Sequence, residues 1–533
     1  MENEKNTPTW KQFNRPWYQK IFLSIWSYIH NVVLMIWGVL KAIPVKLKGL
    51  FLAIGRCFKG LGQRFKYGDW RTRVSYLIMG FGNFTRGKNQ ILKGLLWLLV
   101  EVAYVLFLVF VGIGNLSLLS VPQADVDYNT IGEIARVPNP SGMGYQFLDN
   151  SITILLYSVL TVLLTIFFLF MWVKYTKVAY ETQQQAQAGK ELSTPKQQLN
   201  YALNDGYHVT ILALPIIGVL LITVLPLLTN ILVAFTNFDI NHMIPSKLFG
   251  WVGFKNFATV FGSSYGSIIW KILGWTLIWA FFATFTNFFF GMFLAMMINK
   301  KSIKLKPFWR TCFIIVIAIP DFITLLMMSK FFGFNNSSLT GPFNKILMDW
   351  FGITFRVNGE VSVGGMAWLG GATSGGSPTL ARVMVIIINM WRGMPYTMLA
   401  TSGILMNIPD ELYESSRIDG AGPVRRFVSI TFPYIMFVMA PQLITTFTGN
   451  INNFNVIFFL TGGGPNITTQ KGITYGQTEL LITWLYSLTI KDGSNQEYGN
   501  AAVIGIFIFI ITSFFALIVF NSSKSNKQED TFQ

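Results

Sequence analysis

Cysteine, histidine and charge are scarce in this chain of 533 residues, which has 2 Cys, 3 His and only 12% charged residues. Cys57 and Cys312 lie in unrelated segments, so neither a disulfide framework nor a cluster of metal ligands is expected. Soluble domains carry about a quarter charged residues. Half that share, together with 48 Phe and 16 Trp, leaves more apolar surface than a soluble core can bury. The composition therefore predicts an all-α polytopic membrane protein.

Long apolar runs recur along the chain, each near the roughly 20 residues that a helix needs to cross the hydrocarbon. A lone strand in lipid would leave its backbone polar groups unpaired, so we expect each run to be a helix. About eight transmembrane helices are predicted, at residues 91–114, 152–173, 209–236, 268–298, 308–330, 381–407, 434–460 and 500–520.

Positive charge is concentrated at the N-terminal end. The net charge of the chain is +17, and residues 1–90 hold 15 Lys and Arg against three acids. These basic residues interleave with apolar runs and accompany no nucleic-acid-binding motif, so we expect membrane lipid as their partner and no nucleic acid. The uncharged run 21–40 has His30 and Asn31 in its middle and basic flanks. This pattern favours a helix in the membrane interface over a ninth span.

Basic residues also predict the orientation in the membrane. The connections 174–208, 299–310, 408–433 and 521–533 together hold 14 Lys and Arg, whereas the longer alternate connections hold only 7. Because basic loops stay on the cytoplasmic side, we expect a multi-pass protein of the bacterial cell (plasma) membrane with both termini cytoplasmic.

One short polar segment lies between the sixth and seventh runs. Pro409 suits the first turn of a helix, and Gly420 can adopt the left-handed conformation that ends one. The spacing Glu414-Ser-Ser-x-x-x-Gly420, nine residues, then Ile430-x-Phe-Pro433 resembles the EAA motif of binding-protein-dependent ABC importers, with serine in place of both alanines. In that family this helix docks in a cleft of the ATPase subunit. The resemblance implies an ATPase-coupling role for Glu411, Glu414, Ser415, Ser416, Asp419, Gly420, Ile430 and Pro433.

The resemblance covers about 440 residues, from near residue 90 to the end. It includes Asn389-Met-Trp-Arg-Gly-Met-Pro-Tyr396 and Leu460-Thr-Gly-Gly-Gly-Pro465. These segments look like the sugar-importer branch, and within it the chain resembles the maltose/maltodextrin permease subunit with eight spans. The implied fold is a type I (MetI-like) ABC importer transmembrane domain. We expect residues 1–90 to form a basic cytoplasmic or interfacial extension, 91–200 the first two spans with a polar loop, and 201–525 the permease domain with its coupling loop 408–433.

A mixture of amides and aromatic rings in two spans is typical of a sugar path. Asparagine in mid-membrane is costly unless it faces other helices or a wet cavity, and sugars need amide hydrogen bonds and flat aromatic faces. The amides could equally hold helices together. By resemblance, several of these positions match residues that line the sugar site in the family. The predicted substrate path comprises Trp391, Gly393, Tyr396, Asn450, Asn452, Asn453 and Phe454.

Two intramembrane acids, Glu101 and Asp321, leave an alternative open. They would serve as proton carriers in a gradient-driven secondary transporter, or pack helices against Arg392 or backbone amides. A structural membrane anchor is a third class, which would not need the Asn-rich seventh run. A near match to the phosphate-binding P-loop motif occurs at Gly82-Asn-Phe-Thr-Arg-Gly-Lys-Asn89. It ends in Asn where Ser or Thr should hold magnesium, so we do not expect a nucleotide site there.

The resemblance implies a transport subunit rather than an enzyme, with no catalytic residue, no metal and no cofactor bound by this chain. ATP and magnesium are expected on two partner ATPase subunits. A second permease subunit and an extracytoplasmic sugar-binding lipoprotein are the other implied partners. The implied cargo is an oligosaccharide, with maltose or maltodextrin first.

Overall fold

The structure of this chain is a computed structural model with two compact units, one formed by Met1–Ser117 and Leu156–Pro226 and the other by Leu118–Leu155 and Leu227–Gln533. Residues 21–40 lie outside the described part, so their predicted interfacial placement stays a prediction, as do the predicted domain bounds. The structure describes residues 44–46, 48–49, 51–121, 129–133, 136–138, 145–147, 149–244, 247–262, 265–300, 302–333, 341–353, 356–357, 360–361, 366–370, 377–470, 472–491 and 496–522.

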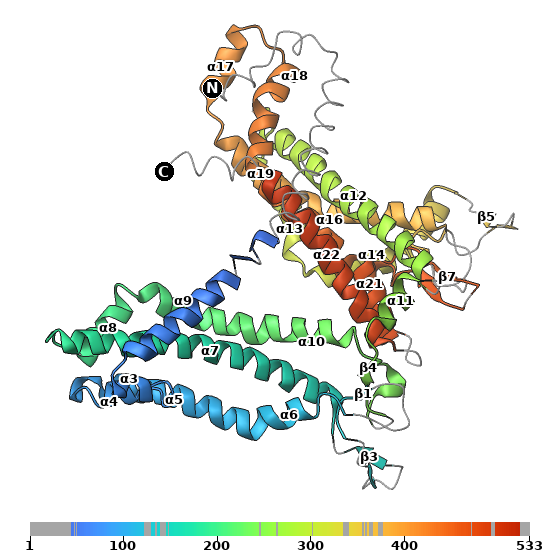
Figure 1. Cartoon of the computed structure of the whole chain (residues 1–533). Helices are drawn as coiled ribbons and strands as arrows, with labels where there is room; N and C mark the ends of the chain where they lie inside the picture. The colour runs from blue at the N-terminus through green and yellow to red at the C-terminus, as the bar shows by residue number, and fades with distance from the viewer. Residues whose placement is uncertain are drawn as a thin grey trace. The chain divides into compact units, whose positions relative to one another are not determined.

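The first unit consists of three long apolar helical segments and a short-helix region that precedes them (Figure 1). The long segments, Lys88–Ser117, Ser151–Gln187 and Tyr207–Val233, confirm the first three predicted spans. Residues 151–155 of the middle segment and residues 227–233 of the third belong to the second unit. The elements are a helix over 51–67, α3 (Trp70–Val74), α4 (Phe81–Phe84), a 3₁₀ turn (Lys88–Gln90), α5 (Ile91–Phe107), a π turn (Leu108–Gly112), α6 (Ile113–Ser117), α7 (Ser151–Gln187), α8 (Pro195–Leu203), α9 (Tyr207–Gly218), a π turn (Val219–Val224) and α10 (Leu225–Val233).

A partly buried ion pair holds the short helices of the first unit together. Asp69 caps α3 by accepting from the backbone N–H of Thr72 and pairs with Arg86 at 2.6 Å. The side chain of Gln183 on α7 accepts from the Thr72 hydroxyl at 2.9 Å. Burial alone would raise the pKa of the Asp69 carboxyl, but the hydrogen bonds from Thr72 and Arg86 outweigh it and lower that pKa below its ordinary value.

The second unit holds the remaining apolar helices that the structure describes, with short paired strands in their connections. Within the described part of the connections lie four two-stranded antiparallel sheets, which pair β1 (Asn129–Thr130) with β4 (Gly250–Trp251), β2 (Arg136–Pro138) with β3 (Tyr145–Phe147), β5 (Arg356–Val357) with β6 (Glu360–Val361), and β7 (Asn466–Thr468) with β8 (Thr474–Gly476). The helices are α11 (Lys255–Phe261), α12 (Gly266–Asn299), α13 (Lys306–Ala318), α14 (Asp321–Phe331), α15 (Pro342–Lys345), α16 (Pro378–Met406), α17 (Asp410–Ile418), α18 (Pro423–Arg426), α19 (Phe432–Ile451), α20 (Phe454–Leu460), α21 (Leu481–Tyr486) and α22 (Tyr498–Ser522), with short 3₁₀ or π turns at Ile240–His242, Ile346–Trp350, Phe427–Thr431 and Ser487–Lys491.

Helices α12 and α16 pack closely because small residues lie between them. A Cβ built on Gly291 of α12 would lie 2.6 Å from Cβ of Thr397, and one on Gly393 of α16 would lie 2.4 Å from Nδ2 of Asn287. Small residues let membrane helices approach this closely, where dispersion and polar contacts between them are strongest. Trp279, fully buried beside this contact, donates its indole N–H to the backbone oxygen of Asn450 at 3.1 Å.

Two of the predicted spans are not single straight helices. The run 308–330 is broken between α13 and α14, which meet at 93°. Proline has no N–H and pushes the preceding residue out of the helical region, and Ile319 is indeed extended before Pro320. The run 434–460 is interrupted where α19 ends at Ile451 and α20 begins at Phe454. Counting the bent pair as one span gives eight helical spans in the described residues, as predicted.

Candidate functional site

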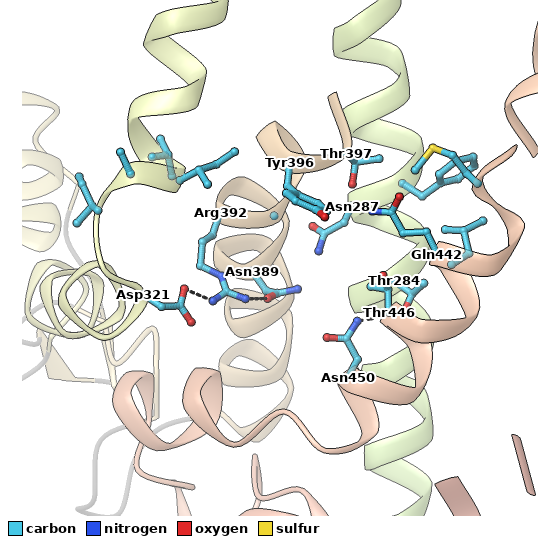
Figure 2. A pocket seen from close by; sticks show the side chains of 18 of the residues that line it. Thr284, Asn287, Asp321, Asn389, Arg392, Tyr396, Thr397, Gln442, Thr446 and Asn450 are labelled. Carbon is cyan, nitrogen blue, oxygen red and sulfur yellow. Dashed lines mark hydrogen bonds and ion pairs between the residues drawn. The ribbon is translucent and has the colours of Figure 1, made fainter. Parts of the chain in front are cut away.

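A cavity of about 450 Å³ lies within the second unit, between α12, the α13–α14 break, α16 and α19 (Figure 2). The break contributes directly, because residues 316–321 on both sides of Pro320 form one wall. Four separate segments therefore converge on one space. Its polar lining residues are Thr284, Asn287, Asp321, Asn389, Arg392, Tyr396, Thr397, Gln442, Thr446 and Asn450.

An ion pair in the lining of this cavity joins α16 to α14. The Arg392 guanidinium donates to the Asp321 carboxylate and, through its other terminal nitrogen, to Oδ1 of Asn389 at 3.1 Å. Arg392 and Asp321 carry opposite charges, so the pair leaves the cavity without net charge. Asp321 is thus paired with Arg392, which is the helix-packing alternative that the sequence left open for it. The other intramembrane acid, Glu101 in the first unit, accepts from the backbone N–H of Met79 at 2.7 Å.

Asn450 forms the opposite side of the cavity and joins two helices. Its side chain lies at 7% exposure and donates to the hydroxyl of Thr284 on α12 at 3.0 Å. The backbone of α19 ends one residue later, and Asn453 accepts from the N–H of Val456 to start α20. Asn450 therefore both lines the cavity and holds α19 against α12, combining the two roles proposed for these amides.

Three buried polar atoms of the lining have no hydrogen-bond partner among the described residues. They are Oδ1 of Asn287, Nδ2 of Asn389 and Nε of Arg392. Buried polar atoms are nearly always paired, so each such atom calls for an explanation. Here one acceptor and two donors lie on residues that line a single cavity. A polyhydroxylated ligand, whose hydroxyls both donate and accept, matches that set.

Only part of the predicted substrate path lines this cavity. Gly393, Tyr396 and Asn450 do. Trp391 is 39% exposed and Asn452 is exposed, and neither lines it. Asn453 caps α20, and Phe454 stacks with Phe458, its ring 4.8 Å away, and meets Tyr486 edge-on.

Sequence reasoning missed most of the polar lining. Asn287 and Gln442 are side-chain amides inside predicted spans, so the argument applied to Asn450 would have found both. Arg392 lies within the quoted 389–396 segment but was considered only as a helix-packing partner. Thr284 and Thr446 give no such signal, because threonine often bonds its own helix backbone.

The predicted coupling segment forms a compact elbow. α17 ends in a Schellman turn, in which the N–H of Gly420 bonds the oxygen of Arg417 at 3.0 Å and the N–H of Ala421 bonds that of Ser416 at 2.9 Å. Gly420 has φ of +74°, the left-handed conformation expected of it. α18 follows at once and continues through a π turn into α19.

The elbow presents most of its predicted coupling residues to the outside. Glu411, Glu414, Ser415, Asp419, Gly420 and Pro433 are exposed, whereas Ser416 and Ile430 are half-buried. Ile418 is 87% exposed beside them, with Val424 also exposed. The hydroxyl of Tyr413 bonds that of Thr431 at 2.8 Å. This bond ties α17 to the start of α19, the helix that carries Gln442, Thr446 and Asn450 into the cavity.

Comparison with known proteins gives consistent matches. Residues 287–524 match the family described as binding-protein-dependent transport system inner membrane component. The chain is 32% identical over 454 residues to the galactooligosaccharides transport system permease protein GanP of Bacillus subtilis, covering 85% of this chain and 97% of that protein. The maltodextrin transport system permease protein MdxF of the same organism is also 32% identical, with 85% and 95% covered.

A third relative matches over a smaller share of both chains. The maltose/maltodextrin transport system permease protein MalF of Escherichia coli strain K12 is 34% identical over 275 residues, 51% of this chain and 49% of that protein. Among solved structures, a bacterial ABC transporter involved in alginate import shares 21% identity at a TM-score of 0.46, covering 62% of this chain and 98% of that one.

Proposed function

Because this chain belongs to the family of binding-protein-dependent transport system inner membrane components, as a permease subunit of a sugar ABC importer, we propose that it conducts a neutral oligosaccharide through the cavity between α12, α14, α16 and α19. Maltodextrin is the first candidate cargo. Family membership favours this function over the gradient-driven transporter that the intramembrane acids left open. The subunit conducts the sugar and is not itself an enzyme.

The unpartnered atoms of Asn287, Asn389 and Arg392 are the observation that carries this proposal. Sugar hydroxyls would complete their hydrogen bonds, and the exposed ring of Tyr396 offers a flat apolar face for a pyranose. Since Arg392 is already neutralised by Asp321, the lining favours an uncharged sugar over an acidic one.

The names of the relatives supply two candidate cargoes. One relative is named for maltodextrin and another for galactooligosaccharides, at the same identity and nearly the same coverage. Maltodextrin comes first because the sequence segments around the elbow and the sixth span resemble the maltodextrin branch. Galactooligosaccharide is the second candidate, supported by the match over 97% of that permease.

Force enters the proposed mechanism at the elbow. Two ATPase subunits, which would hold the ATP and magnesium, close and push the exposed face of α17. The Tyr413–Thr431 bond passes this displacement to α19, and the helix moves Gln442, Thr446 and Asn450 against α12 and α16. An extracytoplasmic binding lipoprotein would deliver the sugar, and a second permease subunit would complete the passage. This chain itself would bind no cofactor.

Uptake by the reconstituted complex tests the proposal. The complex of this chain with its partner permease, ATPases and binding protein is placed in liposomes and supplied with radiolabelled maltodextrins, galactooligosaccharides and uronate oligosaccharides. ATP-dependent uptake of a neutral oligosaccharide, abolished by Asn287→Ala, is the expected result. Uptake driven by an ion gradient without ATP, or uptake of uronates alone, would overturn it.

A further inference from the structure

The helix over residues 51–67 in the first unit carries two different exposed stripes. Phe51, Ile54, Phe58 and Phe65 form an apolar stripe, and Arg56, Lys59 and Lys66 form a basic one. At 100° per residue the apolar side chains fall on one side of the helix and the basic side chains on the next. An apolar stripe beside a Lys/Arg stripe is the pattern of a helix at a membrane surface.

The third side of this helix is fixed to the rest of the unit. Leu61 is buried there, and its backbone oxygen accepts from the hydroxyl of Tyr76 at 2.9 Å. The guanidinium of Arg64 donates to Oγ1 of Thr176 on α7 at 3.0 Å. Arg73 donates to the backbone oxygens of Phe65 and Lys66. These contacts hold the helix in place. The ring of Phe65 also packs edge-on against Tyr76, with centroids 5.3 Å apart, whereas Phe51, Ile54, Phe58 and the basic stripe are exposed.

The contacts with α7 place the helix at the edge of the hydrocarbon. Arg64 reaches α7 at Thr176, where the apolar run 152–173 gives way to Lys174 and Lys177. The indole of Trp172 donates to the backbone oxygen of Tyr76 at 3.0 Å, and Trp side chains gather at membrane–water interfaces. In Figure 1 the helix over residues 51–67, the blue helix that precedes α3, runs obliquely to α7.

We propose that the exposed side of residues 51–67 binds anionic phospholipid headgroups in the leaflet at the C-terminal end of α7. Phe51, Ile54 and Phe58 insert below the headgroups, and Arg56, Lys59 and Lys66 contact the phosphates. A soluble partner protein is the alternative occupant, and the contact of this helix with α7 where its apolar run ends favours lipid. The basic residue pattern makes this the cytoplasmic leaflet, where anionic lipid attracts basic side chains most strongly. The proposal is independent of which sugar is carried.

Lipid binding is measured on the purified full-length protein by native mass spectrometry, with phosphatidylglycerol and phosphatidylcholine as competing probes. Arg56→Gln/Lys59→Gln/Lys66→Gln removes three charges and leaves Arg64 and the packed side unchanged. Its preference for phosphatidylglycerol is expected to fall by about tenfold or more, since each basic side chain near a surface contributes severalfold. The charge-preserving Arg56→Lys/Lys59→Arg/Lys66→Arg variant should bind as the natural protein does. An unchanged preference in the glutamine variant overturns the proposal.

A second measurement does not depend on that triple variant. A spin label at Phe58→Cys, with Cys57→Ser and Cys312→Ser, reports the surroundings of the apolar stripe in nanodiscs. We expect the label to be highly accessible to oxygen and poorly accessible to a water-soluble nickel reagent. Its insertion depth should increase with the phosphatidylglycerol content of the nanodisc. Full access to the nickel reagent, or exclusion of both quenchers by a covering protein, overturns lipid insertion.

Discussion

Arg392 on α16 donates to the carboxylate of Asp321, the first residue of α14 after the break at Pro320. The two side chains are 21% and 44% exposed, so the pair faces the cavity instead of being sealed in the protein. The contact holds the bent α13–α14 segment against α16 and cancels the positive charge beside Asn389. One bond therefore controls both the shape of the cavity wall and its electrostatics.

Removing one member of this pair should be worse than removing both. Asp321→Asn leaves Arg392 charged and unpaired, and Arg392→Leu leaves the carboxylate alone, whereas the double variant leaves neither. We expect both single variants to unfold in detergent at a lower temperature than the natural protein. The unfolding temperature of the double variant should lie between those of the single variants and that of the natural protein. Losses that simply add in the double variant would show that the contact does not stabilise the break.

Gly393→Ala should disturb the contact between α12 and α16. The added Cβ would lie 2.4 Å from Nδ2 of Asn287, so the amide must turn or the helices must separate. Sugar uptake is expected to fall by about tenfold, the scale of one lost hydrogen bond to a ligand. Gly403→Ala on the same helix meets no atom within 4 Å and is the matched control. Its uptake should be unchanged, and equal losses at the two positions would contradict this account.

Alanine substitution should slow sugar uptake at Asn450 but not at Asn452. Asn450→Ala removes a cavity-lining amide and its bond to Thr284. Asn452 is exposed, lines no part of the cavity and should tolerate alanine. We expect at least about tenfold slower uptake for Asn450→Ala and a rate within twofold of natural for Asn452→Ala. Equal sensitivity of the two would place the sugar path beyond α19, along the route predicted from sequence.

Gly420→Ala should uncouple the ATPase from transport while the protein still inserts. The residue has φ of +74°, which a side chain disfavours, although a Cβ there meets no atom. Gly422→Ala is the matched control, since its φ of −68° suits any residue and its surroundings are also open. Sugar-stimulated ATP hydrolysis is the measurement. Full stimulation in the Gly420 variant would remove the elbow from the coupling mechanism.

The hydrophobic runs predicted each span seen in the described residues, because membrane helices must satisfy their backbone internally, which leaves a strong local signal. The break at Pro320 shows what that signal omits. Run length alone did not predict a 93° bend, although proline is a usual cause of one. The Gly420 turn was predictable since its conformation depends on neighbouring residues only.

Cavity residues were harder to predict because lining depends on which side of each helix faces its neighbours. Asn450 and Asn452 are two residues apart in one Asn-rich stretch, yet the first is buried at the cavity and the second is exposed. The end of α19 at Ile451 separates them, and a sequence alone does not fix how that helix is rotated. Asn287 also lies inside a predicted span, so the cost of an amide in mid-membrane applies to it as it does to Asn450.

The rate of cysteine labelling in the cavity tests the central claim most directly. Thr446→Cys is introduced into the Cys57→Ser/Cys312→Ser protein, and the complex is labelled with a maleimide reagent, with and without binding protein, maltodextrin and ATP. We predict that the transported sugar slows labelling at this position severalfold and has no effect on Ser429→Cys at the elbow. A labelling rate at Thr446→Cys that is the same with and without every transported sugar would contradict passage through this cavity.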